Sequence, residues 1–168
     1  MKNQHFVVFI LLLSSNLSGQ EPLKMPFGST DEQFRAAVEK RKTERTVGKI
    51  RSVSLHKTQV TDHGLRPIRQ FKGLQSLSLS DTRISDAGLQ HLEKLAELNT
   101  VDLFATRISD KGLRTLSRMK SLQRVAIRKT GITDAGLAHL AKRKGLEHLD
   151  LRETLITDAG LLHLKALS

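Results

Sequence analysis

The stretch LQSLSLSDTRISDAGLQHLEKLA, residues Leu74–Ala96, decides the fold, because the same pattern recurs along most of the chain. Its first apolar residues alternate with polar ones, as in a strand that is buried on one side. Its last three leucines lie three residues apart, as along one face of a helix. This change of period, from about 2 to about 3.6 residues, predicts a strand that leads into a helix.

The pattern returns every 24 residues, and the chain contains five copies in register. We place the copies at residues 50–73, 74–97, 98–121, 122–145 and 146–168. One such unit cannot bury its apolar side alone, whereas stacked units bury it against each other. The sequence therefore predicts a solenoid in which each copy adds one strand to a parallel sheet and one helix to the opposite side.

Two polar features recur in every copy. The ninth residue is threonine, and we expect its hydroxyl to bond the backbone of the turn that leaves the strand. A motif of Thr or Ser, Asp, any residue, Gly and Leu follows; its hydroxyl is suited to cap the helix and its Asp to interact favourably with the helix dipole. Glycine is unfavourable inside a helix, so its recurrence in all five copies needs a physical reason. We expect the reason to be that a Cβ at this position would collide with the adjacent coil. The threonines are Thr58, Thr82, Thr106, Thr130 and Thr154, and the glycines are Gly64, Gly88, Gly112, Gly136 and Gly160.

The consensus LxxLxLxxTxI(S/T)DxGLxxLxxL, over residues 50–168, resembles the leucine-rich repeat. The 24-residue period and the helix starts are similar to those of bacterial secreted and surface proteins, and also to those of the F-box ubiquitin-ligase adaptors. The resemblance implies the α/β class, as a right-handed horseshoe arc with parallel strands on the concave face and helices on the convex face. It also implies protein binding rather than catalysis, and no cofactor.

The N-terminal residues 1–19 have the pattern of a cleavable signal peptide. A lysine precedes eight consecutive apolar residues, 6–13, and a mostly small and polar segment follows. Eight residues are too few to cross a bilayer, which needs about 20. We therefore expect an exported protein, periplasmic, surface-bound or secreted, with no transmembrane segment in the mature chain.

Two further segments precede the copies. Residues 20–28 contain two prolines and a glycine, and we interpret them as a linker. Residues 29–49 are predicted to form a capping helix that covers the apolar side of the first copy. The spacing of Ser29 and Glu32 is that of a capping box at the start of this helix.

Composition limits the partners. The chain has no cysteine, which excludes disulfides and thiolate chemistry, and its net charge of +11 favours anionic partners. An anionic polysaccharide or cell-envelope polymer bound by basic convex residues is one alternative function, and a solvated basic surface is the structural alternative. Nucleic acid is disfavoured, because aromatic residues are only 4% of the chain. An intracellular ubiquitin-ligase-type substrate adaptor is a third possibility if the N-terminal apolar stretch is retained.

The outward residues of the predicted strands vary strongly between copies, as a specific binding face would. Phe104 stands out, because aromatic and arginine residues are enriched among the residues that dominate binding energy. Packing of Phe104 on a neighbouring arginine, with no binding role, is the alternative. The candidate ligand-binding residues are His56, Asp81, Asp102, Phe104, Arg124, Arg128, Lys129, His148, Asp150 and Arg152.

Other recurring groups have a structural interpretation. His91, His139 and His163 share one helical position, but neighbouring coils separate them too widely for one metal ion. We therefore predict no metal site and no catalytic group. Arg143 replaces a core residue of the other copies, which the pattern does not explain. The last copy has no cap in this sequence, and its apolar side suggests a fragment of a longer chain, an end-to-end dimer or a missing partner.

Overall fold

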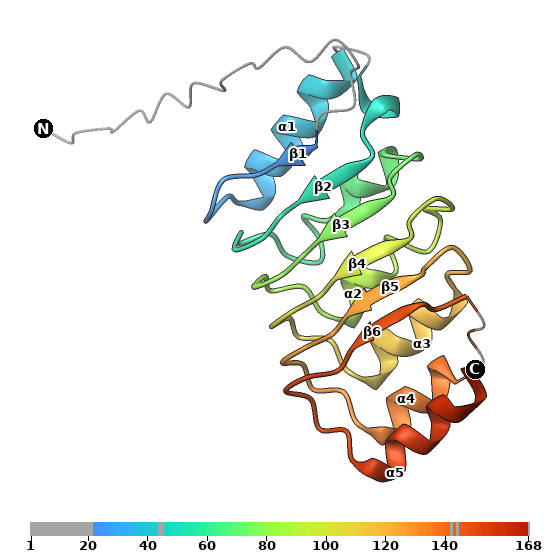
Figure 1. Cartoon of the computed structure of the whole chain (residues 1–168). Helices are drawn as coiled ribbons and strands as arrows, with labels where there is room; N and C mark the ends of the chain where they lie inside the picture. Colours follow the sequence, from blue (N-terminus) through green and yellow to red (C-terminus); the bar gives the residue numbers. More distant parts are fainter. Residues whose placement is uncertain (1–21, 44–45, 142, 144, 168) are drawn as a thin grey trace, which may run out of the picture.

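The computed structural model describes residues 22–43, 46–141, 143 and 145–167, so the predicted signal peptide lies outside the described residues. Within these described residues, six parallel strands form one sheet in chain order, and the helices cover one side of it (Figure 1). The strands are β1 (Leu23–Lys24), β2 (Ser52–Ser54), β3 (Ser76–Ser78), β4 (Thr100–Asp102), β5 (Arg124–Ala126) and β6 (His148–Asp150). The predicted α/β solenoid is confirmed.

The strand register follows the 24-residue period. Equivalent residues of successive copies are partners across the sheet, from Ser52 opposite Ser76 to Arg124 opposite His148. The middle residue of each strand from β2 to β5 is buried. Each copy therefore presents the same inward residues to a continuous, mainly aliphatic core, to which Phe34 and Phe71 add aromatic rings.

The helical side is less uniform than the strands. Its elements are α1 (Asp31–Thr43), η1 (Val47–Lys49), η2 (Arg66–Gln70), α2 (Asp86–Leu89), α3 (Asp110–Arg118), α4 (Asp134–Leu140), α5 (Asp158–Leu161) and η3 (Leu162–Leu167), where η marks a 3-10 helix. The first copy forms η2 where the pattern predicts an α-helix. Pro67 lies in the interior of that expected helix and lacks the amide hydrogen that an α-helical bond requires there.

The N-terminal residues differ from prediction in two places. The segment 20–28, which we expected to be a linker, contains β1, and Leu23 pairs with Val53 of β2. The capping box lies one residue later than predicted. Gln33 Oε1 accepts from the amide of Thr30 at 2.9 Å, and Thr30 Oγ1 accepts from the amide of Gln33 at 3.4 Å.

The pair Ser29 and Glu32 is therefore the wrong assignment for this capping box. The Ser29 hydroxyl is buried and donates to the carbonyl of Pro26 at 2.7 Å, so it holds the preceding turn instead. Phe34 and Val38 of α1 are fully buried within the same core as the first copy.

The recurring threonine closes the turn after each strand, as predicted. In every copy its hydroxyl donates to the carbonyl three residues earlier, at 2.6 to 2.7 Å. The residue before each threonine has a positive φ, between 52° and 57°, although none of the five is glycine. This backbone turn is the same in every copy, so it fixes the direction in which the side chains at the strand ends point.

The recurring aspartate joins one coil to the next, in an arrangement that we call the carboxylate clamp. Its Oδ1 accepts the amide of the Thr or Ser that starts the next helix, at 2.7 to 2.8 Å, and its Oδ2 accepts the hydroxyl of that residue. The pairs are Asp31–Thr61, Asp62–Ser85, Asp86–Ser109, Asp110–Thr133 and Asp134–Thr157. Asp31 of α1 extends the series to the coil before the first copy.

The clamp gives the recurring glycine its physical reason. A Cβ on Gly136 would lie 2.1 Å from Oδ1 of Asp110, and the equivalent glycines meet the equivalent aspartates. The expected collision with the adjacent coil is thus confirmed. The expected capping role is weaker: Ser85 and Ser109 accept an amide at 3.4 Å, while Thr133 and Thr157 make no such bond.

Arg143 takes a core position in the connection between α4 and β6. Its side chain is buried, and Nη2 donates to the carbonyls of Leu122 at 2.8 Å and Lys120 at 3.3 Å. Burial lowers its pKa. Arg143 therefore satisfies backbone acceptors of the preceding coil, a role that the apolar residues at this position in the other copies cannot perform.

Candidate functional site

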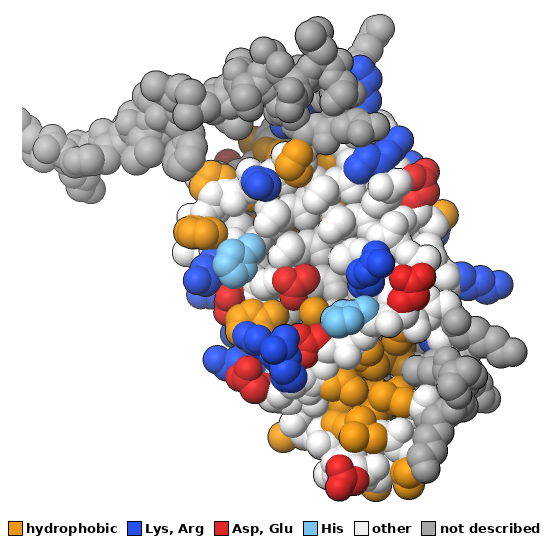
Figure 2. Space-filling model, in the orientation of Figure 1, with side chains coloured by type: hydrophobic (Ala, Val, Ile, Leu, Met, Phe, Trp, Pro, Cys, Tyr) orange, Lys and Arg blue, Asp and Glu red, His pale blue; other side chains and the backbone are white. Residues whose placement is uncertain are grey.

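The strand side presents rows of equivalent residues that run across the coils. One row is Ser52, Ser76, Thr100, Arg124 and His148, and the next is Ser54, Ser78, Asp102, Ala126 and Asp150. The first coils therefore offer small hydroxyl side chains, whereas the later coils offer charged ones. Figure 2 shows this change as a pale central surface bordered by groups of charged side chains.

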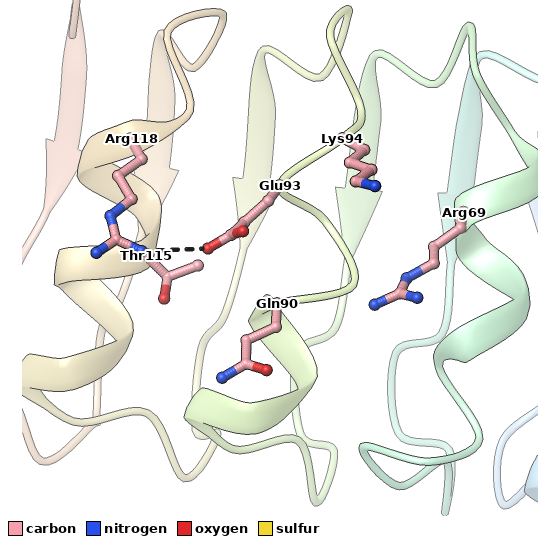
Figure 3. A pocket seen from close by; sticks show the side chains of 6 residues that line it. All are labelled: Arg69, Gln90, Glu93, Lys94, Thr115 and Arg118. Carbon is pink, nitrogen blue, oxygen red and sulfur yellow. Dashed lines mark ion pairs between the residues drawn. The ribbon is translucent and has the colours of Figure 1, made fainter.

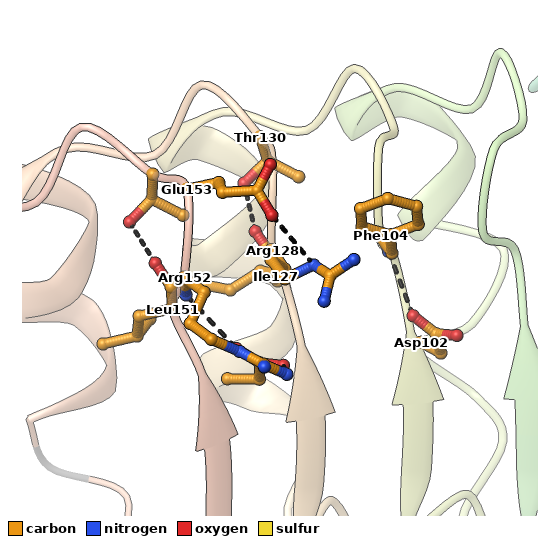
Figure 4. Close-up of polar contacts among 10 residues, drawn as sticks. Asp102, Phe104, Ile127, Arg128, Thr130, Leu151, Arg152 and Glu153 are labelled. Atoms are coloured by element: carbon orange, nitrogen blue, oxygen red, sulfur yellow. Dashed lines mark hydrogen bonds and ion pairs between the residues drawn. The ribbon is translucent and has the colours of Figure 1, made fainter.

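Phe104 and Arg128 form the centre of the charged half (Figure 4). The guanidinium carbon of Arg128 lies 4.4 Å from the centroid of the Phe104 ring, which is a cation–π distance. The Arg128 Nε atom is buried and lies 3.3 Å from Glu153 Oε1, without the alignment of a hydrogen bond. Phe104 is thus half-buried against Arg128 and is less exposed than the sequence suggested, and this contact is the packing on a neighbouring arginine that the alternative interpretation of Phe104 predicts.

Two aspartates fix the backbone of this cluster in the same way. Asp102 Oδ1 accepts the amide of Phe104 at 3.1 Å, and Asp150 Oδ1 accepts the amide of Arg152 at 3.2 Å. The Asp102 carboxylate also accepts the Ser80 hydroxyl of the preceding coil. Each aspartate therefore holds the residue two positions later, where the strand ends.

Asp150 and Arg152 form the shortest ion pair of the face among the described residues. Arg152 donates to both carboxylate oxygens, with Nε at 2.8 Å and Nη2 at 2.5 Å. The hydrogen bond from the Arg152 side chain is the main reason why the pKa of Asp150 falls to about 2, and the same contact raises the pKa of Arg152. Both groups stay charged at neutral pH.

A second cluster lies at the N-terminal end of the face. His56 Nδ1 is 3.9 Å from Asp81 Oδ2, and its ring meets the Phe27 ring edge-on, with centroids 5.6 Å apart. The Lys57 ammonium lies 5.8 Å from the centroid of Phe27. Phe27 is 75% exposed, and sequence reasoning missed it because it precedes the first copy.

The remaining predicted residues border these clusters. Arg124 Nη2 lies 3.4 Å from Glu147 Oε2, and His148 is exposed beside Arg124 in the adjacent strand. Lys129 is exposed, and its amide donates to the carbonyl of Arg152 at 3.0 Å. The structure thus places all ten predicted residues on the strand side, but in two clusters and a border rather than in one pocket.

The repeat geometry decides the family. The family model for the leucine-rich repeat matches residues 74–95, within the unit that recurs through the stack. The chain is a leucine-rich repeat protein.

Two solved structures show the same leucine-rich repeat fold. Internalin C2 from Listeria monocytogenes is 25% identical with a TM-score of 0.60, and the match covers 72% of this chain and 49% of that one. An internalin (inlF) from the same species is 18% identical with a TM-score of 0.53, covering 73% and 40%. This chain therefore spans less than half the length of these internalins. No curated protein sequence matches it.

Two negative findings concern the described residues of this leucine-rich repeat protein. No helix among them combines the length and apolar character that a membrane crossing requires. No group of three or more His, Asp or Glu side chains among them is arranged to hold a metal ion.

Proposed function

We propose that this chain is an exported, non-catalytic protein-interaction module that binds a protein ligand on its concave strand face. The leucine-rich repeat fold supports the interaction role. The contact between Phe104 and Arg128 is the observation that favours this face as the binding surface, because aromatic residues and arginine dominate the binding energy of protein interfaces.

The scaffold prepares this surface for binding. The clamp and the threonine turn repeat in every copy, so the backbone at the strand ends has one conformation before a ligand arrives. Asp102 and Asp150 further hold the backbone of Phe104 and Arg152. A surface that is already ordered loses less conformational entropy on binding.

The test is capture of ligand by the immobilised chain from the culture medium and from a cell-envelope extract. The variant Phe104→Ala/Arg128→Ala is expected to weaken capture by at least about thirtyfold, since the truncation of even one residue of this kind costs about 2 kcal/mol or more. Arg83→Ala/Arg107→Ala, at exposed positions outside both clusters, is the control and should capture normally. Normal capture by the first variant would exclude this surface.

Export has its own test. The N-terminal residue of the protein isolated from its natural source is determined by mass spectrometry. We expect the mature chain to begin within or just after residues 14–20, since cleavage follows the apolar segment of a signal peptide. Retention of the apolar stretch in a protein found inside the cell would instead favour the intracellular adaptor.

A further inference from the structure

The helical side carries two adjoining hollows, opposite the strand face. The first has a volume of about 390 Å³ and is lined by Arg69, Gln90, Glu93, Lys94, Thr115 and Arg118 (Figure 3). The second, of about 600 Å³, lies between α1 and η2, and includes Arg35, Glu39, Arg66 and again Arg69. Since Arg69 lines both, we treat them as one helical track that crosses four consecutive coils.

The helical track has positive charge that the described residues leave unbalanced. Its two carboxylates are already paired, Glu93 with Arg118 at 3.7 Å and Glu39 with Lys42 at 3.2 Å. The cations of the track that form no ion pair with a described carboxylate are Arg35, Arg66, Arg69 and Lys94. All four are exposed, so an anionic ligand reaches them without displacing a partner.

His91 lies close enough to the track to respond to its charge. Burial lowers its pKa, and the nearby charges of Arg69 and Arg66 lower it further, against the opposing influence of Asp62. Its Nδ1 atom is buried and has no hydrogen-bond partner among the described residues. An anion bound at Arg69 would offset part of this positive potential, so the pKa of His91 would rise.

We propose that the helical track binds a linear anionic polysaccharide, whose successive carboxylate or sulfate groups contact Arg69, Lys94 and the cations of neighbouring coils. Packed helices lie about 8–10 Å apart, so the unpaired cations of three successive coils lie within the reach of one extended polymer. Contacts on several coils reinforce each other, although each exposed ion pair is weak.

The uncharged lining favours a sugar polymer over a nucleic acid. Gln90 and Thr115 bring an amide and a hydroxyl into the first hollow, where they can exchange hydrogen bonds with sugar hydroxyls (Figure 3). Among the described residues, the imidazole of His63 is the one aromatic ring that lines either hollow, and no phenylalanine does, so the track offers few rings on which single-stranded bases could stack. The exposed or half-exposed phenylalanine rings of the described residues, Phe27 and Phe104, belong to the clusters of the strand face.

The experiment measures binding of the full chain to polygalacturonate and to dextran sulfate, with uncharged dextran as the neutral control. We expect at least one of the two anionic polymers to bind and neutral dextran to remain unbound. A preference for polygalacturonate would indicate recognition of carboxylates, and a preference for dextran sulfate would indicate recognition of sulfates. Arg69→Gln/Lys94→Gln should weaken binding roughly tenfold, near the upper range for two exposed ion pairs. It should also reduce the slope of log affinity against log salt by about one to two.

The matched control is Arg83→Gln/Arg107→Gln, which removes the same charge at exposed positions that line neither hollow. It should change the affinity less than the track variant does. An NMR titration of His91 should show a higher pKa with polymer bound, independently of any substitution.

Four outcomes would overturn the proposal. Two of them are unchanged binding by the track variant and an equal loss in the control. The third comes from the same assay repeated with polyuridylate and polyglutamate, if either binds as tightly and in a track-dependent way. The fourth is a pKa of His91 that does not respond to bound polymer. The polyuridylate result would indicate a nucleic acid, and the polyglutamate result an acidic protein.

Discussion

Each recurring glycine lies so close to an aspartate of the preceding coil that a Cβ on the glycine would overlap the carboxylate. The sequence shows that this glycine recurs five times at an unfavourable position, so the need for close approach was predictable. The aspartate that the glycine approaches was not predictable. The period shows which residues of the copies are equivalent, but it does not show which side chain of one coil contacts which residue of the next. Asp110 and Gly136 are the clearest example of such a crossing.

Replacement of this glycine should destabilise the stack. In Gly136→Ala, the new Cβ would lie 2.1 Å from Asp110 Oδ1 and 3.0 Å from its Cα, so the carboxylate must leave Thr133. We expect a loss of about 1–3 kcal/mol in the free energy of unfolding, measured with denaturant, despite the better helix propensity of alanine. Gly131→Ala is the control, because its Cβ meets its nearest atom at 3.7 Å. Equal stabilities would contradict the clamp as the reason for the glycine.

At the scale of elements, the sequence determines the strands better than the helices. Every strand from β2 to β6 lies where the alternating leucines place it, because one buried face fixes the register. The strand β1 was not predicted, because its two residues lie between prolines and are too few to show an alternation of apolar and polar residues. The helical side has no such constraint: η2, which contains Pro67, and η3, which contains no proline, are both 3-10 helices where the pattern predicts an α-helix.

The last coil, and its junction with the coil before it, should lose stability in acid. Hydrogen bonds from the hydroxyl and amide of Thr157 lower the pKa of Asp134, and the Arg152 side chain lowers the pKa of Asp150 to about 2. A carboxylate whose pKa is lower in the folded than in the unfolded state stabilises the fold at every pH above its unfolded-state pKa, here 3.8. This stabilisation is lost as the pH falls from that value through the folded-state pKa.

The unfolding temperature should therefore fall between about pH 4 and pH 2 because of these two groups. In Asp134→Asn/Asp150→Asn the decline over this range should be shallower than in the unmodified chain. Glu97→Gln, at an exposed carboxylate, serves as the control in the same calorimetric series. An identical acid decline in both chains would mean that these contacts do not link pH to stability.

At the scale of the whole molecule, stacking determines which surfaces are exposed. The concave face was predictable, because outward strand positions follow from the period. Its division into two clusters was not, since the N-terminal cluster depends on Phe27, which lies outside the copies. The far end shows a broad apolar area (Figure 2), where Leu146, Leu149 and Leu151 are only partly buried.

We propose that this apolar end supports an end-to-end dimer. Leu161 is 45% exposed, although the equivalent leucines of the four preceding copies are fully buried. Leu161→Lys should convert a dimer to a monomer in analytical ultracentrifugation, because a charge would be buried in the contact. Leu162→Lys, at a position 58% exposed, is the control and should leave the dimer intact. The dimer proposal would be wrong if the unmodified chain itself sedimented as a monomer.

The carboxylate clamp also makes each 24-residue unit transferable as a whole. Each unit receives the carboxylate of its predecessor on a hydroxyl and an amide, and offers its own carboxylate to its successor. A duplicate of residues 98–121 spliced in before residue 122 would therefore complete both of its joints with no other change. An insertion that is not a whole number of units would change the separation of 23 residues between the aspartate and the hydroxyl of the joint in which it falls, so that joint would have to bulge or break, whereas added complete units leave every joint intact.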